Sequence, residues 1–428
     1  MSLWHSLRAR QWDAYKVYLI IVFTWSFGFA AITTVNLVYQ AVVAGLSPLQ
    51  LVLVGTTLEI TAFLLEVPTG VVADAYSRRL SVIIGYALIG LGFLVEGLFP
   101  VFGLIVLAQV IWGAGITFIS GAEGAWLVDE IGEARSGDAF VRASQVGNFG
   151  GLVGIGAGSV IAALFGTAAA IVIGALILIG LAAFLGIAMP ERGFKPAPKA
   201  DRPPMFRHMA ETFKGGVQAV RGRRILAVLF GITLFTGLYS EGWDRLWTPH
   251  LIDNVGVPAL GAFEPVVWFG VLRAVTMIAA IGAAEVVRRT VKAEQSARVL
   301  WAISLTDGAM IAAQIGFALT GDFVTAAVLY VISQTLRGAI SPVFFAWSNR
   351  YIESSVRATT LSMINQMNAL GQIGGGPGVG WIGERFGVRA ALVFSSLLLA
   401  PVLPLYAWTR RLARRSDFNP PPSQSSEG

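Results

Sequence analysis

The sequence predicts an all-α integral membrane protein with twelve transmembrane helices, arranged as two six-helix bundles that form a parallel repeat. Three observations predict this fold: long apolar runs, basic residues gathered on one side of these runs, and a segment that recurs in both halves. Of the 428 residues, 55% are hydrophobic and 13% are charged, and the mean hydropathy is +0.69. Soluble proteins carry about 25% charged residues, so this composition excludes a soluble enzyme, a disordered chain and a nucleic-acid binder.

The chain contains no cysteine and only three histidines, His5, His208 and His250. A disulfide, a thiolate nucleophile and a cysteine metal site are therefore excluded, and the histidines are too scattered for a metal cluster. We expect no catalytic residue, no cofactor and no metal ion.

A helix needs about 20 apolar residues to cross the hydrocarbon core of a bilayer. Twelve segments meet this length: 15–43, 49–73, 80–98, 101–128, 139–164, 168–189, 225–248, 265–287, 297–319, 323–347, 358–382 and 388–407. The first segment is too long for a signal peptide, so we expect it to be retained as a helix. The apolar runs are continuous rather than alternating, which excludes membrane-spanning strands.

The positions of the basic residues predict the orientation of the chain. If the N-terminus is cytoplasmic, the cytoplasmic segments hold 26 of the 31 lysines and arginines. The outer loops then hold only Arg385 and Arg389, and three more arginines fall inside predicted helices. We therefore expect a multi-pass protein of a bacterial-type inner (plasma) membrane with both termini in the cytoplasm, and we attribute the basic pI to this topology.

One long connection divides the chain into two halves. The expected organisation is an N-terminal six-helix bundle over 1–189, a cytoplasmic linker over 190–224, a C-terminal six-helix bundle over 225–409 and a cytoplasmic tail over 410–428. The linker is expected to be a tether that includes an amphipathic surface helix, and a plain tether is the alternative. The tail from Asp417 is rich in proline and serine, which predicts disorder.

The two halves share a repeated segment. When the chain is shifted by 221 residues, 145–172 aligns with 366–393 without a gap, and nine positions are identical, among them Gly150/Gly371, Gly154/Gly375 and Gly166/Gly387. Two like-oriented halves are typical of secondary transporters that work by a rocking movement. The first segment also carries a glycine ridge at helical spacing: Gly147, Gly150, Gly151, Gly154 and Gly158. Ordinary close packing and a sliding surface between the two halves both explain such a ridge.

The connection between the second and third spans carries a motif, EVPTGVVADAYSRRLSVIIG, with Gly70, Asp74, Arg78 and Arg79 at characteristic spacing. This motif resembles the one that the major facilitator superfamily has between the same two helices. Ser77 stands where the family usually has a second glycine. Together with the twelve spans, the central cytoplasmic loop and the repeat, the resemblance covers nearly the whole chain and implies the major facilitator fold.

The charges of this motif suggest a gating contact. Asp74 is expected to end a helix at the membrane surface, where it would attract the facing end of a helix in the other half. Arg78 is expected to pair with an acidic residue at the inner end of the fourth helix, Asp129 first and Glu123 second. The family resemblance implies that such a cluster latches the outward-open state. A purely topological role of the charges is the alternative, and it explains Arg79 better than Asp74.

Three further segments, EVPTG, GAEGAWLVDE and YSEGWDRLW, are similar to the branch of the superfamily that contains drug and macrolide exporters. Two features of that branch differ here. Gln109 stands at about the position of the usual arginine in the fourth helix, and the Gly-Pro pair usual in the fifth helix is found instead at Gly376-Pro377 in the eleventh.

Charged groups inside a bilayer are costly, so they usually face a cavity or a partner. Glu59 and Glu66 lie seven residues apart in the second span, hence on one face and about 10 Å apart along the axis. A buried carboxylate binds a proton more readily than an exposed one, which suits proton exchange. The alternative is a structural glutamate bonded to a neighbouring helix.

The second half contains six further charged groups within its spans: Glu241, Asp244, Arg245, Arg273, Asp307 and Arg337. Counting the helical rise from the inner ends places Glu241 and Arg273 at similar depth, about 21–24 Å. The same count places Asp307 and Arg337 at about 12–14 Å. These depths predict two ion pairs, Glu241–Arg273 and Asp307–Arg337, although Arg337 could instead face the cavity and meet an anionic substrate or Glu66.

Several polar and aromatic residues fall on the first, fourth, seventh and tenth helices, which line the cavity in this fold: Trp25, Asn36, Gln40, Gln109, Trp112, Tyr239, Trp243 and Gln334. Aromatic rings with a few polar groups suit amphiphilic organic substrates. Anchoring at the membrane interface is the alternative for the tryptophans.

These observations predict a secondary active transporter that works by alternating access as a monomer in the lipid bilayer. The expected activity is proton-coupled efflux of hydrophobic or amphiphilic small molecules, as in multidrug resistance. Uptake, or transport of one specific metabolite, is the alternative on the same fold. No enzyme motif and no phosphate-binding GxxxxGK[ST] is present, and a receptor without transport is the remaining class.

Overall fold

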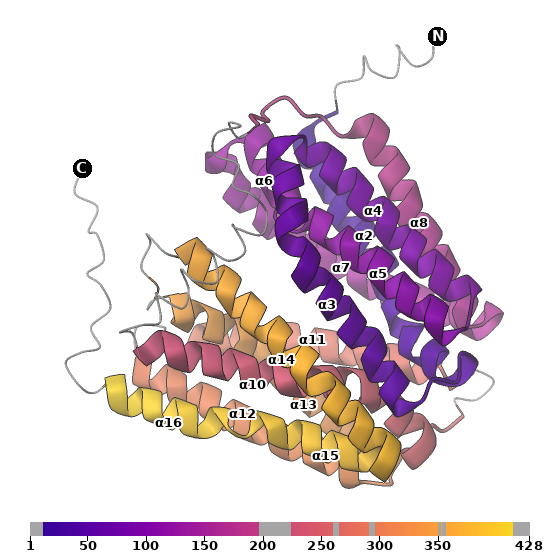
Figure 1. The fold of residues 1–428 in the computed structure, drawn as a ribbon, viewed down its shortest axis with the longest axis vertical. Helices are drawn as coiled ribbons and strands as arrows, with labels where there is room; N and C mark the ends of the chain where they lie inside the picture. Colours follow the sequence, from indigo (N-terminus) through magenta and orange to yellow (C-terminus); the bar gives the residue numbers. More distant parts are fainter. Residues whose placement is uncertain are drawn as a thin grey trace. The chain divides into compact units, whose positions relative to one another are not determined.

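The computed structural model describes residues 12–196, 224–259, 265–290, 296–349, 352 and 357–413. Nearly all of these residues are helical (Figure 1). The predicted surface helix of the linker and the predicted disordered tail lie outside the described residues.

The helices of the first half match the predicted spans in order. They are α2 (Ala14–Val38), α3 (Pro48–Ala75), α4 (Arg78–Leu98), α5 (Phe102–Ile119), α6 (Ala122–Ile131), α7 (Glu133–Phe165) and α8 (Thr167–Ala188). A π-helical turn, η1 (Tyr39–Val43), extends α2 to the end of the first predicted span. The fourth span is divided into α5 and α6, because Gly121 between them has a positive φ of 73°.

The second half follows the same scheme. Its helices are α10 (Arg224–Pro249), α11 (Val267–Thr290), α12 (Ser296–Leu319), α13 (Phe323–Asn349), α14 (Arg357–Phe386), α15 (Val388–Leu399) and α16 (Val402–Ala413). A second π-helical turn, η3 (His250–Val255), extends α10. The last predicted span is divided into α15 and α16 next to Pro401, which has no N–H group to continue the helical hydrogen bonding.

Eleven helices in the described part of the chain are long and apolar enough to cross a membrane. The remaining predicted span, 358–382, is the 30-residue helix α14, which is not among these eleven. Its sequence is rich in glycine, asparagine and glutamine, so it is long enough to span a bilayer but much less apolar than the others. The all-α membrane fold predicted from the sequence is confirmed.

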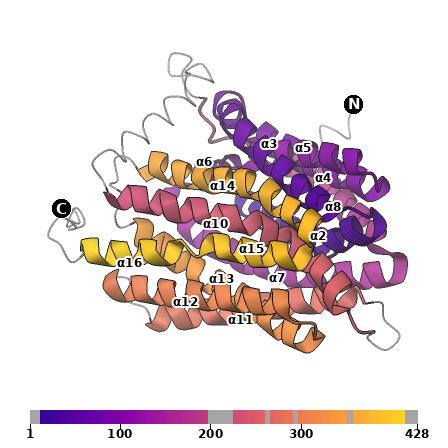
Figure 2. The same cartoon turned by 60° about the horizontal axis from the view of Figure 1, so that its bottom comes forward.

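Contacts divide the chain into two compact units. Unit 1 comprises Met1–Leu46, Thr57–His208 and Ala259–Ala274, and unit 2 comprises Ser47–Thr56, Met209–Pro258 and Val275–Gly428. Each unit therefore corresponds to one half of the chain, apart from two short segments at the start of α3 and α11. In unit 1, α2 packs along α7 and α8, and α4 packs along α5 and α8 (Figure 1). In unit 2, α10 packs along α14 and α15, and α12 packs along α13, α15 and α16 (Figure 2).

The repeated glycines make the same close contact in both units. In unit 1, a Cβ atom at Gly154 would overlap the carbonyl oxygen of Phe27 on α2. In unit 2, a Cβ atom at Gly375 would overlap the carbonyl oxygen of Leu238 on α10. The matching pair Gly150 and Gly371 approaches the backbone of α2 and α10 one turn earlier. The glycines that coincide in the sequence repeat therefore occupy equivalent packing positions in the two units.

The glycine ridge of α7 is thus a packing surface within its own unit. Gly147, Gly150, Gly154 and Gly158 all face α2, where an added Cβ would meet Val22, Phe23, Phe27 or Ala31. The interpretation of these four glycines as a sliding surface between the halves is therefore wrong, and the alternative of ordinary close packing is correct. Small residues are needed because only they allow two helix backbones to approach so closely.

A second pair of repeated glycines forms the same turn. Gly166 between α7 and α8 has φ 86° and ψ 160°. Gly387 between α14 and α15 has φ 89° and ψ 160°. This region is open to glycine alone among the common residues, because a side chain would clash with the backbone.

Candidate functional site

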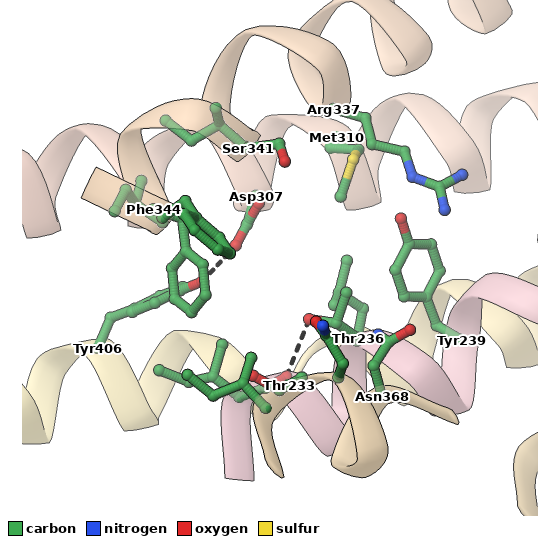
Figure 3. A pocket seen from close by; sticks show the side chains of 17 residues that line it. Thr233, Thr236, Tyr239, Asp307, Met310, Arg337, Ser341, Phe344, Asn368 and Tyr406 are labelled. Carbon is green, nitrogen blue, oxygen red and sulfur yellow. Dashed lines mark hydrogen bonds between the residues drawn. The ribbon is translucent and has the colours of Figure 1, made fainter. Parts of the chain in front are cut away.

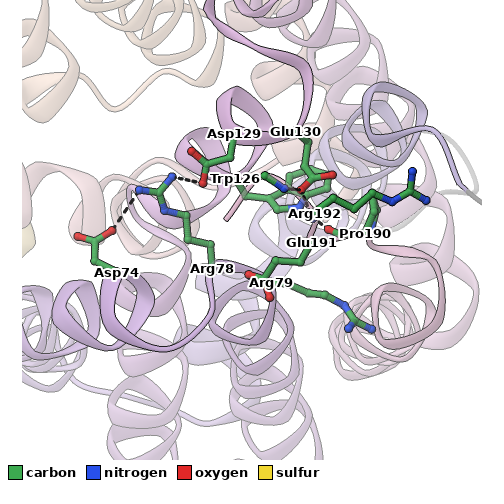
Figure 4. A network of polar contacts seen from close by, with 10 residues as sticks. Asp74, Arg78, Arg79, Trp126, Asp129, Glu130, Pro190, Glu191 and Arg192 are labelled. Carbon is green, nitrogen blue, oxygen red and sulfur yellow. Dashed lines mark hydrogen bonds and ion pairs between the residues drawn. The ribbon is translucent and has the colours of Figure 1, made fainter. Parts of the chain in front are cut away.

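The turn between α3 and α4 carries the predicted gating motif (Figure 4). Arg78 opens α4, and its Nη1 donates to Asp129 Oδ2 over 2.5 Å. Its Nη2 lies 3.4 Å from Asp74 Oδ1. Asp129 is the partner that the sequence analysis placed first for Arg78, whereas Glu123 accepts a hydrogen bond from Tyr86 over 2.6 Å. Arg78 therefore links the end of α3 to the end of α6.

The two contacts of Arg78 differ in their exposure. The side chains of Arg78 and Asp129 are 21% and 26% exposed, whereas the side chain of Asp74 is 61% exposed. The contact with Asp129 is shorter and less hydrated, so it is the stronger of the two. The proposed attraction between Asp74 and a helix end in the other half stays a prediction.

The other predicted motif residues have local roles. Gly70 lies within α3, and a Cβ atom there would meet nothing within 4 Å. Arg79 Nη2 donates to the carbonyl oxygen of Gly186 over 2.6 Å. Ser77, which replaces the usual glycine, has an extended backbone that any residue adopts, and its Oγ accepts a hydrogen bond from Leu80 N over 2.9 Å. The serine therefore caps α4, which a glycine side chain cannot do.

Residues beyond the motif complete this polar cluster. Ser77 Oγ donates to Glu191 Oε2 over 2.7 Å, and Glu191 Oε1 accepts from the backbone N–H of Arg79 over 2.9 Å. Glu130 accepts from the backbone N–H groups of Arg192 and Gly193 over 2.5 and 2.7 Å. Sequence reasoning missed these two glutamates. Glu191 belongs to a Pro-Glu-Arg-Gly sequence that directly follows the sixth span. This position at the end of a span is the signal that could have identified it.

A second polar network lies inside unit 1 around Glu96, which sequence reasoning also missed. The Glu96 side chain is fully buried and accepts hydrogen bonds from Gln40 Nε2 over 2.6 Å and from Gln109 Nε2 over 3.1 Å. Gln109 in turn accepts from Trp112 Nε1 over 2.8 Å, and Tyr39 donates to the Glu96 carbonyl oxygen over 2.6 Å. The glutamine that replaces the usual arginine of the fourth helix is therefore a neutral donor to a buried carboxylate.

Replacing Glu96 with alanine is expected to destabilise the protein by about 2 kcal/mol, because the amide donors of Gln40 and Gln109 would lose a buried acceptor. Glu96→Gln retains an acceptor oxygen and should cost clearly less. Thermal denaturation of the purified protein in detergent measures both variants. Equal melting temperatures for the alanine and glutamine variants would show that these hydrogen bonds do not stabilise the fold.

The other carboxylates of the first half lie in different surroundings. Glu66 is exposed rather than enclosed by protein, and it accepts a hydrogen bond from Ser120 Oγ over 2.8 Å. Its position on α3 leaves it at the surface of the protein, and its predicted depth in the membrane stays a prediction. Glu59 is half-buried on the same helix.

Unit 2 contains a cavity of about 560 Å³ between α10, α12, α13, α14, α15 and α16. Its walls are largely apolar and aromatic (Figure 3). Polar side chains also reach it, and they include Thr233, Thr236, Asp307, Arg337, Asn365 and Asn368. Of the predicted cavity residues, Tyr239 lines it, whereas Trp243 is fully buried and packs against Phe317 with ring centroids 5.3 Å apart.

The charged groups of the second half pair differently from the prediction. Both guanidinium nitrogens of Arg337 donate to Asp244, over 2.5 and 2.9 Å, so the predicted pair Asp307–Arg337 is wrong. Asp307 Oδ2 instead accepts a hydrogen bond from Tyr406 over 2.9 Å. Equal depth along two helices does not fix which way each side chain points around its helix, and α10 brings Asp244 to the guanidinium.

The pair predicted between Glu241 and Arg273 would join the two units, and it stays a prediction. Glu241 Oε1 accepts from Arg245 Nε over 2.9 Å, one turn later in the same helix. Both side chains are largely buried, and Gly55 leaves room for them, since an added Cβ there would overlap Glu241. Arg273 Nη1 donates to the carbonyl oxygen of Thr33. Glu241 therefore has a local i,i+4 partner on α10.

The aromatic residues predicted to line a cavity in the first half form a ring cluster. Trp25 stacks on Phe29 with centroids 4.6 Å apart, and Trp112 stacks on Phe93 with centroids 5.1 Å apart. Phe29 and Trp112 also approach each other, with centroids 6.3 Å apart. Trp25 and Trp112 therefore take part in ring packing within unit 1, and their contact with a substrate or with the membrane interface stays a prediction.

Comparisons with known proteins agree with this architecture. The family model described as Major Facilitator Superfamily matches residues 17–376. The chain is 23% identical over 367 residues to the uncharacterized MFS-type transporter YxaM of Bacillus subtilis (strain 168), an alignment that covers 84% of this chain and 86% of the relative.

Solved structures show the same fold. A bacterial homolog of the human lysosomal transporter Spinster, in an inward-facing and unoccupied conformation, has a TM-score of 0.75 at 17% identity, and the match covers 93% of this chain and 98% of the homolog. The nucleoside transporter NupG has a TM-score of 0.69 at 14% identity, with 94% and 100% covered. A POT family transporter in complex with a thioalcohol-conjugated peptide has a TM-score of 0.68 at 14% identity, with 94% and 96% covered.

The matched residues extend from the first helix to α14 and include the motif of the α3–α4 turn, the buried network around Glu96 and most of the cavity of unit 2. The family and its structural relatives are transporters, so the protein is a transporter and not an enzyme. The chain belongs to the Major Facilitator Superfamily of multi-pass membrane transporters.

Proposed function

We propose that the protein is a secondary active transporter that works by alternating access and exports hydrophobic or amphiphilic small molecules in exchange for protons. The observation that carries this proposal is the cavity of about 560 Å³ in unit 2, whose walls combine aromatic and aliphatic side chains with several polar ones. Binding sites for organic molecules of drug size have this volume and this composition. The excess of basic residues in alternate loops supports a location in a bacterial-type inner membrane with both termini in the cytoplasm.

The cluster around Arg78 supports the alternating-access part of the proposal. Arg78 joins three segments through Asp74 and Asp129, and both contacts are between charged groups that a small movement of α3 or α6 would separate. Such contacts suit a latch that forms in one state of the cycle and opens in another.

Uptake, or transport of one specific metabolite, is the second candidate. The polar side chains of the cavity favour it, because Asn365 and Asn368 can fix the orientation of a polar substrate by hydrogen bonds. The two candidates differ in the direction of net transport and in the range of compounds that are accepted.

Transport by the purified protein in proteoliposomes, with and without an imposed pH gradient, tests the proposal. Fluorescent amphiphiles are expected to accumulate inside inverted vesicles when the lumen is acidic, and to stop accumulating when an ionophore collapses the gradient. Efflux should also respond to Glu59→Gln, Glu66→Gln and Glu241→Gln, measured singly over a range of pH, if one of these groups exchanges the proton. Transport that ignores the pH gradient for every compound tested would rule out proton antiport.

A further inference from the structure

We propose that the cavity of unit 2 is a binding site for organic cations, in which Asp307 supplies the opposing charge. Of the seventeen described residues that line the cavity, Asp307 and Arg337 carry a formal charge at neutral pH. This inference rests on the proposed function for its physiological meaning, and it names the substrate class that the cavity selects.

The charge of Arg337 is already neutralised. Two nitrogens of its guanidinium donate to the two carboxylate oxygens of Asp244, over 2.5 and 2.9 Å, in a bidentate contact. This geometry is the strongest that an arginine forms with a carboxylate. An anionic ligand would have to displace Asp244, so the arginine does not make the cavity a site for anions.

The charge of Asp307 is not neutralised within the cavity. Its side chain is 7% exposed, and it accepts a hydrogen bond from the neutral hydroxyl of Tyr406, over 2.9 Å at Oδ2. Figure 3 shows the carboxylate at one side of the cavity with Tyr406 and Phe344, while Arg337 and Tyr239 lie at the other side. With the charge of Arg337 balanced by Asp244, the described residues that line the cavity leave a net charge of about −1, which is that of ionised Asp307.

A buried carboxylate of this kind needs a positive charge or a proton. Burial of an unpaired ion costs several kcal/mol, and a bound cation removes that cost through direct attraction in a medium of low polarity. The aromatic residues Phe344, Phe345 and Tyr406 line the same cavity, and the face of an aromatic ring attracts a cation. A carboxylate beside aromatic rings recognises an ammonium or phosphonium group, and the aliphatic walls accept its apolar body.

Equilibrium binding to the full-length protein in nanodiscs, without any gradient, tests this site. The probes are radiolabelled tetraphenylphosphonium, a monovalent organic cation, and triphenylphosphine oxide, an uncharged molecule of related shape. We expect saturable binding of the cation, and we expect Asp307→Asn to weaken it about tenfold or more, since a charge contact of about 1.4 kcal/mol is lost. Binding of the uncharged probe should be unchanged in this variant, which also reports that the cavity remains folded.

Two further variants make the test specific. Asp322→Asn makes the same chemical change at an exposed cap of α13 outside the cavity, and it should bind the cation like the unmodified protein. Asp307→Glu retains the charge and should bind the cation more tightly than Asp307→Asn. The inference is overturned if the unmodified protein does not bind tetraphenylphosphonium saturably, if the uncharged probe binds equally well, or if Asp307→Asn binds the cation unchanged.

The binding test and the transport test separate the two proposals. Cation binding that depends on Asp307, without transport driven by a pH gradient, would contradict proton antiport and leave the site intact. Transport of uncharged amphiphiles driven by a pH gradient, without cation binding, would support antiport and overturn the cation site.

Discussion

Replacing Gly154 with leucine is expected to prevent stable packing of α2 against α7, and Gly375→Leu should do the same for α10 and α14. In each case even the first side-chain atom would overlap a carbonyl oxygen of the facing helix. A backbone cannot turn aside as a side chain can, so the two helices would have to separate along several turns. The expected loss of stability is about 3 kcal/mol or more, at the upper end of the usual cost of overpacking.

Each variant has a matched control on the same helix. Gly156 on α7 and Gly378 on α14 are exposed, and an added Cβ at either position would meet nothing within 4 Å. Gly156→Leu and Gly378→Leu should therefore melt close to the unmodified protein in detergent, and they should elute as monodisperse peaks in size-exclusion chromatography. If Gly154→Leu and Gly156→Leu melt at the same temperature, the close approach of α2 and α7 does not contribute to stability.

The sequence predicts this fold well because membrane helices have a strong and local signal. In hydrocarbon, only helices and closed β-barrels satisfy the hydrogen bonds of the backbone. The apolar runs lack the alternation of apolar and polar residues that barrel strands have, so each run had to be helical. The repeat is equally informative, because Gly154 and Gly375 coincide in the alignment and also make equivalent contacts. The helix breaks at Gly121 and Pro401 were not predicted, because each depends on a single residue within a continuous apolar run.

Side-chain partners were less predictable, because they depend on the rotation of each helix about its axis. Helical rise placed Asp307 and Arg337 at equal depth, yet Asp307 meets Tyr406 and Arg337 meets Asp244. No rule of spacing connects residues 99 positions apart, as Asp307 and Tyr406 are. Arg78 and Asp129 could be matched in advance because both fall at the ends of predicted spans, where the sequence alone places them on the same predicted side.

Arg78→Gln and Asp129→Asn are each expected to lower the rate of transport about tenfold or more, if their contact holds one state of the cycle. Each single change removes the same 2.5 Å contact, so the double variant should be no slower than either single one. Exchanging the two charges, as Arg78→Asp with Asp129→Arg, should restore part of the activity. Initial rates in proteoliposomes, corrected for the amount of folded protein, measure all four.

Arg142→Gln is the appropriate control, because it removes one positive charge from α7 at an exposed position outside this cluster. Its transport rate should match that of the unmodified protein. A topological role of Arg78 would instead affect insertion, so the amount of correctly oriented protein would fall while the rate per molecule stayed unchanged. Strictly additive losses in the double variant would likewise show that Arg78 and Asp129 act separately, and the latch would then have to lie elsewhere.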